Sequence, residues 1–157
     1  MRKSFLLYIG LLTATYIVAQ TCQNPGMRLE WLRQPGLTKD TIYKWVKNDL
    51  DFIQIQKRDT IADIGSYDGY YPLMYSIFTD SVAFYLNDIS STGFGYFDSI
   101  KSICTRLKGP LISNKFTTVI GNDSSTKLPG HLFSKVIIRD ALHHFKLGND
   151  IVIHTRC

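Results

Sequence analysis

The chain has 157 residues, 45% of them hydrophobic, which corresponds to one domain with an ample core. Its net charge is +5 at pH 7, without a run of basic residues, so nothing indicates a nucleic acid as partner. The three cysteines, Cys22, Cys104 and Cys157, are too few and too scattered for a disulfide framework or a zinc site. One disulfide in an oxidising compartment would leave one thiol free.

The first 19 residues have the layout of a secretory signal peptide. Arg2 and Lys3 precede an uncharged run from Phe5 to Ala19, which is short for a membrane span. We expect cleavage after Ala19 and export to the periplasm or the extracellular space. The alternative is an uncleaved segment that anchors the protein in a membrane, and no other part of the chain suggests membrane contact.

Residues 20–56 form an N-terminal lead-in. Its first part, residues 20–36, is polar and is interrupted by two Pro-Gly pairs, so we expect turns there. Apolar residues at near-helical spacing then predict a helix within residues 37–56. Thr38 or Asp40 would cap this helix.

From residue 57 onward, strand and helix patterns alternate. Strands are expected at 60–64, 81–88, 115–121 and 133–139, and helices at about 70–79, 94–107 and 140–145. This alternation predicts an α/β fold with a parallel sheet, and the apolar strands predict cover on both faces of that sheet. Only one short strand, residues 151–155, remains afterwards, so we expect the later strands of a doubly wound sheet to be lacking.

The segment at 59–73, DTIADIGSYDGYYPL, joins the first strand to a helix through a turn with two glycines. Asp63 lies near the end of the strand, Gly65 and Gly69 lie in the turn, and Pro72 suits the first turn of a helix. A strand, a glycine turn and a helix N-terminus together are typical of the start of a nucleotide-binding α/β unit.

More polar residues are expected at the carboxyl edge of the sheet, where open α/β sheets bind their ligands. They follow the later strands, and they are Asp88, Asn122, Asp123 and Arg139. Asp88 ends the second strand, and an acid at that place is suited to accept hydrogen bonds from the two ribose hydroxyls of a nucleoside.

Two features argue against NAD as that nucleotide. Tyr67 stands where the dinucleotide fingerprint has its middle glycine, and Asp63 points at the turn where a pyrophosphate would lie, so like charges would repel. A ligand that joins an ammonium group to an adenosine would instead suit Asp63. S-adenosylmethionine is such a ligand.

The four segments IADIGSYDGYYPL, YLNDIS, VIGNDSSTKLP and SKVIIRDALHHF resemble the successive motifs of class I S-adenosylmethionine-dependent methyltransferases. They agree in order and spacing across residues 60–145, and EWLRQPG upstream resembles the lead-in of a subgroup that carries signal sequences. The resemblance implies a Rossmann-like methyltransferase fold with strand order 3-2-1-4. Residues 57–157 would then form a partial S-adenosylmethionine-binding domain.

The resemblance also implies roles for residues at the first two strands. Asp63 would hold the amino group of the cofactor, and Gly65 would let the backbone approach its methionine part, with Ser66 also in the site. Gly69 would let the helix pack on the strand. Asp88 would hold the ribose, with Ile89 against the adenine ring.

At the later strands, Asn122 or Asp123 would meet the adenine amino group, and Arg139 would line the pocket with its backbone. His144 would lie at the rim. Each role has a structural alternative. Asp88 would cap the segment after Ser90, Asn122 and Asp123 would only form a turn, and Arg139 would only start a helix.

The sequence predicts no metal site, names no catalytic residue and does not reveal the methyl acceptor. A sulfonium methyl group is already electrophilic, so the enzyme mainly has to align the acceptor and exclude water. An exported methyltransferase is the main hypothesis. A non-catalytic or truncated methyltransferase-like domain is the alternative.

Overall fold

The computed structural model describes residues 25–109 and 113–139. The predicted signal peptide at 1–19, the helix at 140–145 and the strand at 151–155 lie outside these residues. Within them, no helix combines the length and the apolar character that crossing a membrane requires.

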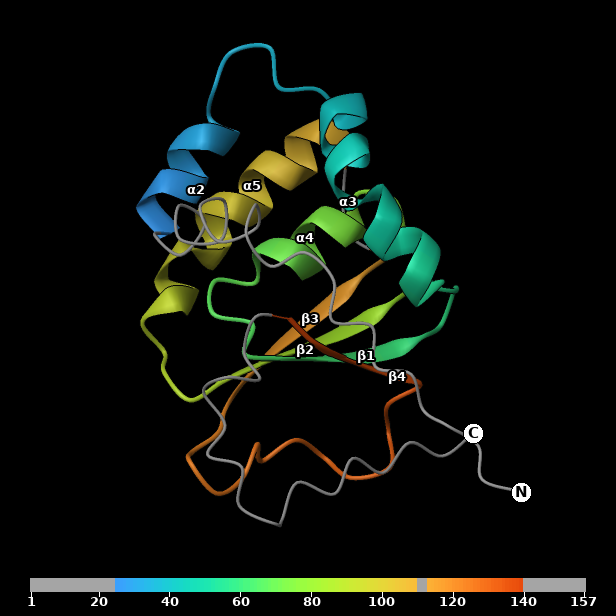
Figure 1. Cartoon of the computed structure of the whole chain (residues 1–157), viewed down its shortest axis with the longest axis vertical. Helices are drawn as coiled ribbons and strands as arrows, with labels where there is room; N and C mark the ends of the chain where they lie inside the picture. The colour runs from blue at the N-terminus through green and yellow to red at the C-terminus, as the bar shows by residue number, and fades with distance from the viewer. Residues whose placement is uncertain (1–24, 110–112, 140–157) are drawn as a thin grey trace, which may run out of the picture.

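A four-stranded parallel sheet forms the centre of the described structure (Figure 1). Its strands are β1 (Thr60–Ile64), β2 (Ala83–Asp88), β3 (Lys115–Ile120) and β4 (Lys135–Ile138). The strand order is β3-β2-β1-β4, with Asp63 of β1 level with Leu86 of β2 and Ile137 of β4. The predicted α/β class and the predicted strand order are both confirmed.

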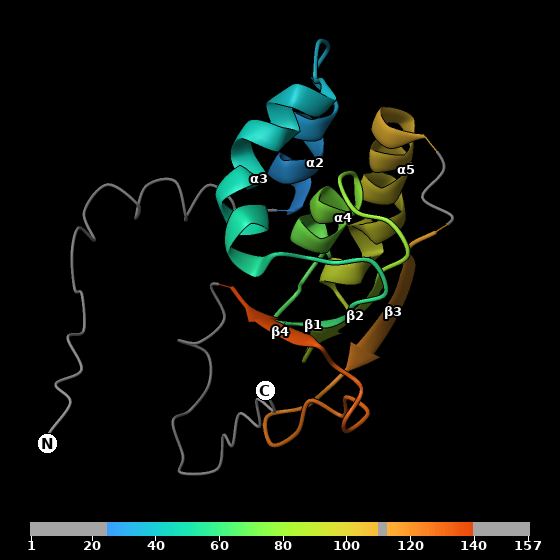
Figure 2. The ribbon, with the colours of Figure 1, turned by 90° about the vertical axis from the view of Figure 1, so that its right-hand side faces the viewer.

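The helices lie on one face of this sheet (Figures 1 and 2). They are α2 (Pro25–Leu32), α3 (Lys39–Ile53), α4 (Tyr70–Ser76), the 3₁₀ helix η1 (Gly93–Tyr96) and α5 (Phe97–Lys108). The chain moves in one direction from β1 through β2 to β3, and right-handed crossovers then place α4 and α5 on the same face. The return from β3 to β4 runs along the opposite face.

On that opposite face, the described residues provide only the connection at 121–134, which contains no helix (Figure 2). Phe133 packs edge-on against Tyr85, with 5.2 Å between their ring centroids. Val136 of β4 remains 43% exposed. Among the described residues, the cover expected on both faces comes from helices on one side and from this connection on the other. Apolar strand residues indicated burial, but they did not show that a loop would supply the cover.

Strand β4 is tied to the residue that precedes β1. Ser134 Oγ donates to Asp59 Oδ1 at 2.8 Å, and Lys135 Nζ forms an ion pair with Asp59 Oδ2 at 2.6 Å. The backbone N–H of Thr60 donates to Ser134 Oγ across 74 residues of sequence. These polar contacts set the register of β4 beside β1.

Of the turns expected in residues 20–36, the one at Pro35 and Gly36 is observed, whereas a helix, α2, starts at the other Pro-Gly pair. Its first residue is Pro25, where proline fits since the N–H group that it lacks would have no partner in a first turn. Leu29 and Leu32, one turn apart, are buried in the core. This spacing of two leucines was the signal for the helix, and the Pro-Gly pair concealed it.

The other elements differ from the expectations mainly at their ends. Thr38 caps α3, since its Oγ1 accepts a hydrogen bond from the Thr41 N–H at 3.2 Å. Helix α4 ends at Ser76, and the helix expected at 94–107 is divided into η1 and α5. Cys104 on α5 is a buried free thiol, and Cys22 and Cys157 lie outside the described residues.

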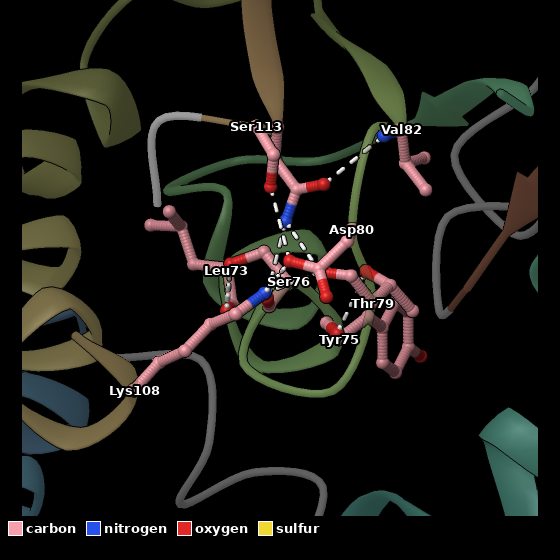
Figure 3. Close-up of polar contacts among 9 residues, drawn as sticks. Leu73, Tyr75, Ser76, Thr79, Asp80, Val82, Lys108 and Ser113 are labelled. Atoms are coloured by element: carbon pink, nitrogen blue, oxygen red, sulfur yellow. Dashed lines mark hydrogen bonds and ion pairs between the residues drawn. The ribbon is translucent and has the colours of Figure 1, made fainter. Parts of the chain in front are cut away.

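Two side chains bind carbonyl groups at the C-terminal end of α4 and in the segment that follows it (Figure 3). Lys108 Nζ donates to Ser76 O at 2.8 Å and to Thr79 O, and it pairs with Asp80 Oδ1 at 2.7 Å. Asn114 Nδ2 donates to the same two carbonyl oxygens, at 3.1 and 2.8 Å. Helix α4 is therefore anchored by α5 and by the residue before β3.

Candidate functional site

The turn between β1 and α4 lies at the carboxyl edge of the sheet, and protein acceptors take its N–H groups. The N–H groups of Gly65 and Ser66 both donate to Asn87 O at 2.9 Å. Tyr67 N–H donates to Asp88 Oδ2 at 2.9 Å, and Gly69 N–H donates to Ser66 O at 2.9 Å. Since these donors are occupied, the turn is not a cradle of free N–H groups for a pyrophosphate.

Three residues of this turn have left-handed backbone conformations: Gly65 (φ 78°), Tyr67 (φ 52°) and Gly69 (φ 70°). A Cβ atom on Gly69 would come within 2.9 Å of the Phe97 ring and 3.0 Å of the Leu86 side chain. Gly69 thus permits both the turn and the close packing beneath it. Tyr67 adopts its conformation at a cost, because a bulky side chain disfavours positive φ.

Gly93 of η1 packs directly on this turn. A Cβ atom at Gly93 would lie 2.5 Å from the carbonyl group of Tyr67 and 2.7 Å from its ring. The ring of Tyr67 therefore lies against η1. The short 3₁₀ helix, which the sequence did not predict separately, supports the turn from one side.

Asp63 is buried on the helix-bearing side of β1, with 4% of its surface exposed. Burial raises the pKa of its carboxyl group to about 6, and the nearby charges of Asp68 and Asp88 add to the rise. The Ser66 hydroxyl and the Arg139 guanidinium oppose the shift without cancelling it. A carboxylate in these surroundings favours a cationic ligand, because the cation would offset the desolvation.

Asp68 is a fourth acidic residue of the edge that sequence reasoning missed. It is fully buried, and its Oδ1 pairs with Arg28 Nη1 at 3.1 Å and accepts the Tyr70 N–H at 3.1 Å. Burial raises the pKa of Asp68, and the charge of Arg28 opposes that rise. The sequence signal was an acid inside the glycine turn, but its partner lies 40 residues earlier on α2.

The carboxylate of Asp88 binds two segments, the β1–α4 turn and the loop that follows β2. Its Oδ2 accepts the Tyr67 N–H, and its Oδ1 accepts the Ser90 N–H at 3.0 Å. The alternative role of Asp88, a cap for the segment after Ser90, is seen only as this bond to the Ser90 N–H, since the N-cap of η1 is Thr92. Each carboxylate oxygen has a further lone pair, so these bonds leave acceptor capacity for two hydroxyl groups.

Apolar surface adjoins Asp88. Ile89, the predicted contact of the adenine ring, is 61% exposed. Ile120 at the end of β3 is level with Asp88 in the sheet and is also exposed. The ends of these two neighbouring strands therefore each expose an isoleucine. Sequence reasoning had not singled out Ile120.

Asn87 joins three parts of the edge, and sequence reasoning also missed it. Its carbonyl oxygen accepts both N–H groups at the start of the β1–α4 turn. Its side-chain Nδ2 donates to Val119 O at 3.0 Å and to Thr126 O at 2.8 Å. A buried asparagine in an otherwise apolar strand was the signal that a network would be needed there.

The Asn122–Asp123 segment forms a turn of its own. Asn122 Oδ1 accepts hydrogen bonds from the N–H and hydroxyl of Ser124, both at 3.0 Å, and from the Ser125 N–H at 2.8 Å. Both Asn122 and Asp123 are exposed. The turn-forming alternative is thus observed for Asn122, and a contact with a base stays a prediction for either residue.

The side chain of Arg139 turns toward the helices. It forms an ion pair with Asp49 of α3, and its guanidinium carbon lies 4.0 Å from the centroid of the Tyr71 ring. Tyr75 Oη also donates to Asp49 Oδ2, at 3.0 Å. The sequence assigned only the backbone of Arg139 to the pocket. The side chain links β4 to α3 and α4, and Asp49 had not been expected to take part.

Three buried side-chain atoms have no hydrogen bond of good geometry in the described part of the chain. They are Ser66 Oγ, Asp68 Oδ2 and Arg139 Nε. Two of the three belong to the β1–α4 turn. His144 lies outside the described residues, and within those residues no group of three or more His, Cys, Asp and Glu side chains is arranged to hold a metal ion.

Two surface hollows of the molecule lie away from the carboxyl edge of the sheet. One of about 440 Å³ lies between α2 and α5, and one of about 160 Å³ lies between α2 and α3. None of their lining residues is a predicted cofactor residue. The candidate site is therefore the carboxyl edge of the sheet around the β1–α4 turn. It contains the buried carboxyl groups of Asp63 and Asp68 and the exposed side chains of Ile89 and Ile120.

No protein-family model matches this sequence, and no match is found among curated proteins. Among solved structures, the chain is similar to the YcgJ protein from Bacillus subtilis, with 19% sequence identity and a TM-score of 0.44. The match covers 66% of this chain and 41% of the YcgJ chain, so the present chain spans less than half of that protein's length. The fold assignment rests on the observed sheet order.

Proposed function

We propose that this protein is an S-adenosylmethionine-dependent methyltransferase domain that binds its cofactor at the carboxyl edge of β1 and β2. The observation that carries the proposal is the buried carboxylate of Asp63 beside the β1–α4 turn. Its charge is poorly compensated by protein groups, since burial dominates its pKa. An ammonium group of a ligand would supply the missing positive charge.

The residues at the edge fit the other parts of such a cofactor. Asp88 has acceptor capacity for two ribose hydroxyls, and Ile89 exposes apolar surface beside it. Ser66 Oγ, buried without a hydrogen bond of good geometry, adds a polar atom within the turn. At Gly65 and Gly69 no side chain covers the backbone of the turn.

A dinucleotide fits this edge less well. The N–H groups that would bind a pyrophosphate already donate to Asn87 and Asp88. Asp63, Asp68 and Asp88 also give this edge three carboxyl groups, of which Asp68 pairs with Arg28, while Arg139, itself paired with Asp49, lies near Asp63. An anion would have to enter against that charge, whereas a cation would be attracted.

S-adenosylmethionine supplies an electrophilic methyl group when it is bound. The chain would hold the amino group through Asp63 and the ribose through Asp88, and the edge would exclude water from the reacting carbon. No side chain is assigned as a general base. The acceptor would be selected by the lead-in helices α2 and α3 and by residues beyond β4.

Export is a further part of the proposal. It rests on the basic N-terminus, the uncharged run and Ala19, all of which lie outside the described residues. The membrane-anchored form remains the alternative location. A protease-protection or fractionation experiment on the expressing cell would separate the two, because only an exported mature chain would lose residues 1–19.

The second candidate function is a methyltransferase-like domain without catalytic activity. It is favoured by the open sheet face, since within residues 25–109 and 113–139 only a loop covers that side. Calorimetry with S-adenosylhomocysteine and with NAD tests the cofactor proposal directly. We expect S-adenosylhomocysteine to bind more tightly, and equal or tighter binding of NAD would contradict the assignment.

Asp88→Asn tests the ribose contact. Asparagine keeps one acceptor oxygen for the Tyr67 N–H, but it cannot also accept the Ser90 N–H, and it loses the charge that strengthens hydrogen bonds to the hydroxyls. We expect S-adenosylhomocysteine to bind about 2 kcal/mol more weakly. Asp40→Asn, on the exposed first turn of α3, is the matched control. Equal effects of both substitutions on binding would exclude the ribose contact.

A further inference from the structure

An ion pair connects helix α2 of the lead-in to the β1–α4 turn. Arg28 Nη1 lies 3.1 Å from Asp68 Oδ1, and both side chains are largely or fully removed from solvent. The guanidinium group of Arg28 also lies over the rings of Tyr70 and Tyr71, with distances of 5.3 and 5.9 Å to their centroids. A charged group held by a carboxylate and two aromatic rings is fixed in position.

Asp68 occupies the middle of the turn, between Tyr67 and Gly69. Its Oδ1 serves both Arg28 and the first N–H of α4, while its buried Oδ2 makes no hydrogen bond of good geometry to the residues described. Burying a carboxylate is costly unless an opposite charge compensates it. Arg28 supplies that charge, so the conformation of the turn depends on a residue of α2.

We propose that Arg28 and Asp68 are a positioning pair that holds the β1–α4 turn in the conformation that receives the ligand. Helix α2, which lies with the other helices on one side of the sheet, then contributes to the ligand site through this ion pair (Figure 2). The pair acts through the backbone of Ser66 and Gly69 and through Tyr67, whose N–H holds Asp88. Its effect on cofactor affinity rests on the proposed function, and its effect on the turn does not.

The test compares Arg28→Gln with Arg33→Gln in the mature chain. Arg33 follows α2 and forms an exposed ion pair with Glu30, so its substitution removes the same charge without uncovering a buried carboxylate. Amide hydrogen exchange is measured across residues 64–71, with residues 84–87 of β2 as the internal reference. We expect exchange in the turn to rise about tenfold in Arg28→Gln only, because local opening becomes easier.

The double variant Arg28→Gln with Asp68→Asn provides the second comparison. Removing both charges leaves no buried ion without a partner, so we expect the turn to exchange more slowly than in Arg28→Gln alone. Arg28→Lys, which keeps the charge, is expected to retain most of the protection. Asp68→Asn alone completes the cycle, and additive effects of Arg28→Gln and Asp68→Asn would overturn the coupling between the residues.

Calorimetry with S-adenosylhomocysteine completes the test. We expect Arg28→Gln to weaken binding about tenfold, and Arg33→Gln to leave it unchanged. If the unaltered chain binds no S-adenosylhomocysteine, the proposed function fails, and exchange in the turn still decides the positioning pair. Equal exchange in the two arginine variants, or a rise that includes β2 equally, would overturn the pair as a local positioning device.

Discussion

The two ends of helix α4 differ in how their polar groups are satisfied. At its C-terminal end, Lys108 and Asn114 bind the last carbonyl groups, and Ser113 Oγ and Lys108 Nζ both donate to Asp80 (Figure 3). At its N-terminal end, Ser66 Oγ and Asp68 Oδ2 are buried without a hydrogen bond of good geometry. The polar groups at the C-terminal end are thus bound within the protein, whereas two side-chain atoms near the N-terminal end have hydrogen-bonding capacity left.

The two ends also differ in how many features that lower the stability of the folded state lie near them. A positive φ angle at Tyr67 and raised pKa values at Asp63 and Asp68 are concentrated at the end of β1 and in the turn that follows it. Such features persist only where the surrounding structure enforces them, and they are common at functional sites. Substitutions at the two ends should therefore have opposite effects on stability and ligand binding.

The largest effect is expected for Asn114→Ala at the C-terminal end. Asn114 Oδ1 accepts the Val82 N–H at 3.0 Å, and its Nδ2 donates to Ser76 O at the end of α4 and to Thr79 O beyond it. Alanine would leave a buried N–H without a partner and remove two further bonds, at a cost of about 4 kcal/mol in the free energy of unfolding. Denaturant unfolding measures the loss. Asn122→Ala, in an exposed turn, is the control and should cost less than about 1 kcal/mol.

Asp63→Asn, at the strand end that leads into the N-terminal end of α4, should stabilise the protein while it weakens ligand binding. Burial raises the pKa of Asp63 from 3.8 to about 6, so between these values the folded state binds more protons than the unfolded chain. The free energy of unfolding of the unaltered protein therefore falls as the pH rises through this window. Above it, the ionised carboxylate costs about 3 kcal/mol.

We expect Asp63→Asn to remove that cost, so that its advantage is small near pH 4 and full at about pH 8. Denaturant unfolding at several pH values measures the difference, with Asp40→Asn as the exposed control. The two curves of stability against pH would run parallel if Asp63 were well compensated in the folded state, and the comparison between the ends of α4 would then fail.

A smaller effect is expected for Gly93→Ala, which tests the close contact between η1 and the β1–α4 turn. Its Cβ atom would lie 2.5 Å from the backbone of Tyr67, so the turn or η1 must shift. We expect a loss of about 2 kcal/mol in the free energy of unfolding. Gly95→Ala is the matched control in the same 3₁₀ helix, since nothing lies within 4 Å of its Cβ atom. Similar losses in both variants would show that helix propensity, and not contact with Tyr67, is being measured.

The sequence predicted the parts of this structure that depend on local patterns. The boundaries of β1 were correct, because Thr60–Ile64 is an apolar run that ends at a glycine turn. The parallel strand order followed from the motifs. The carboxyl edge was also anticipated at Asp63 and Asp88, since strand ends of a parallel sheet meet at one side.

What the sequence did not reveal depends on contacts between distant residues. Arg28 and Asp68 are 40 residues apart, and Arg139 meets Asp49 across 90 residues. Neither pair has a spacing that a local pattern would show. The use of Asn122 Oδ1 by its own turn was likewise one of two readings until the backbone was known. The cofactor roles themselves stay predictions that binding experiments must test.

The position of β4 has a consequence for the order of folding. Strands β1, β2 and β3 are joined by short crossovers, whereas Ser134 meets Thr60 only after a loop of 74 residues has closed. Closing a long loop costs more chain entropy, so β4 should dock after the other three strands have assembled. Weakening the Lys135–Asp59 ion pair would then speed unfolding and leave the refolding rate almost unchanged.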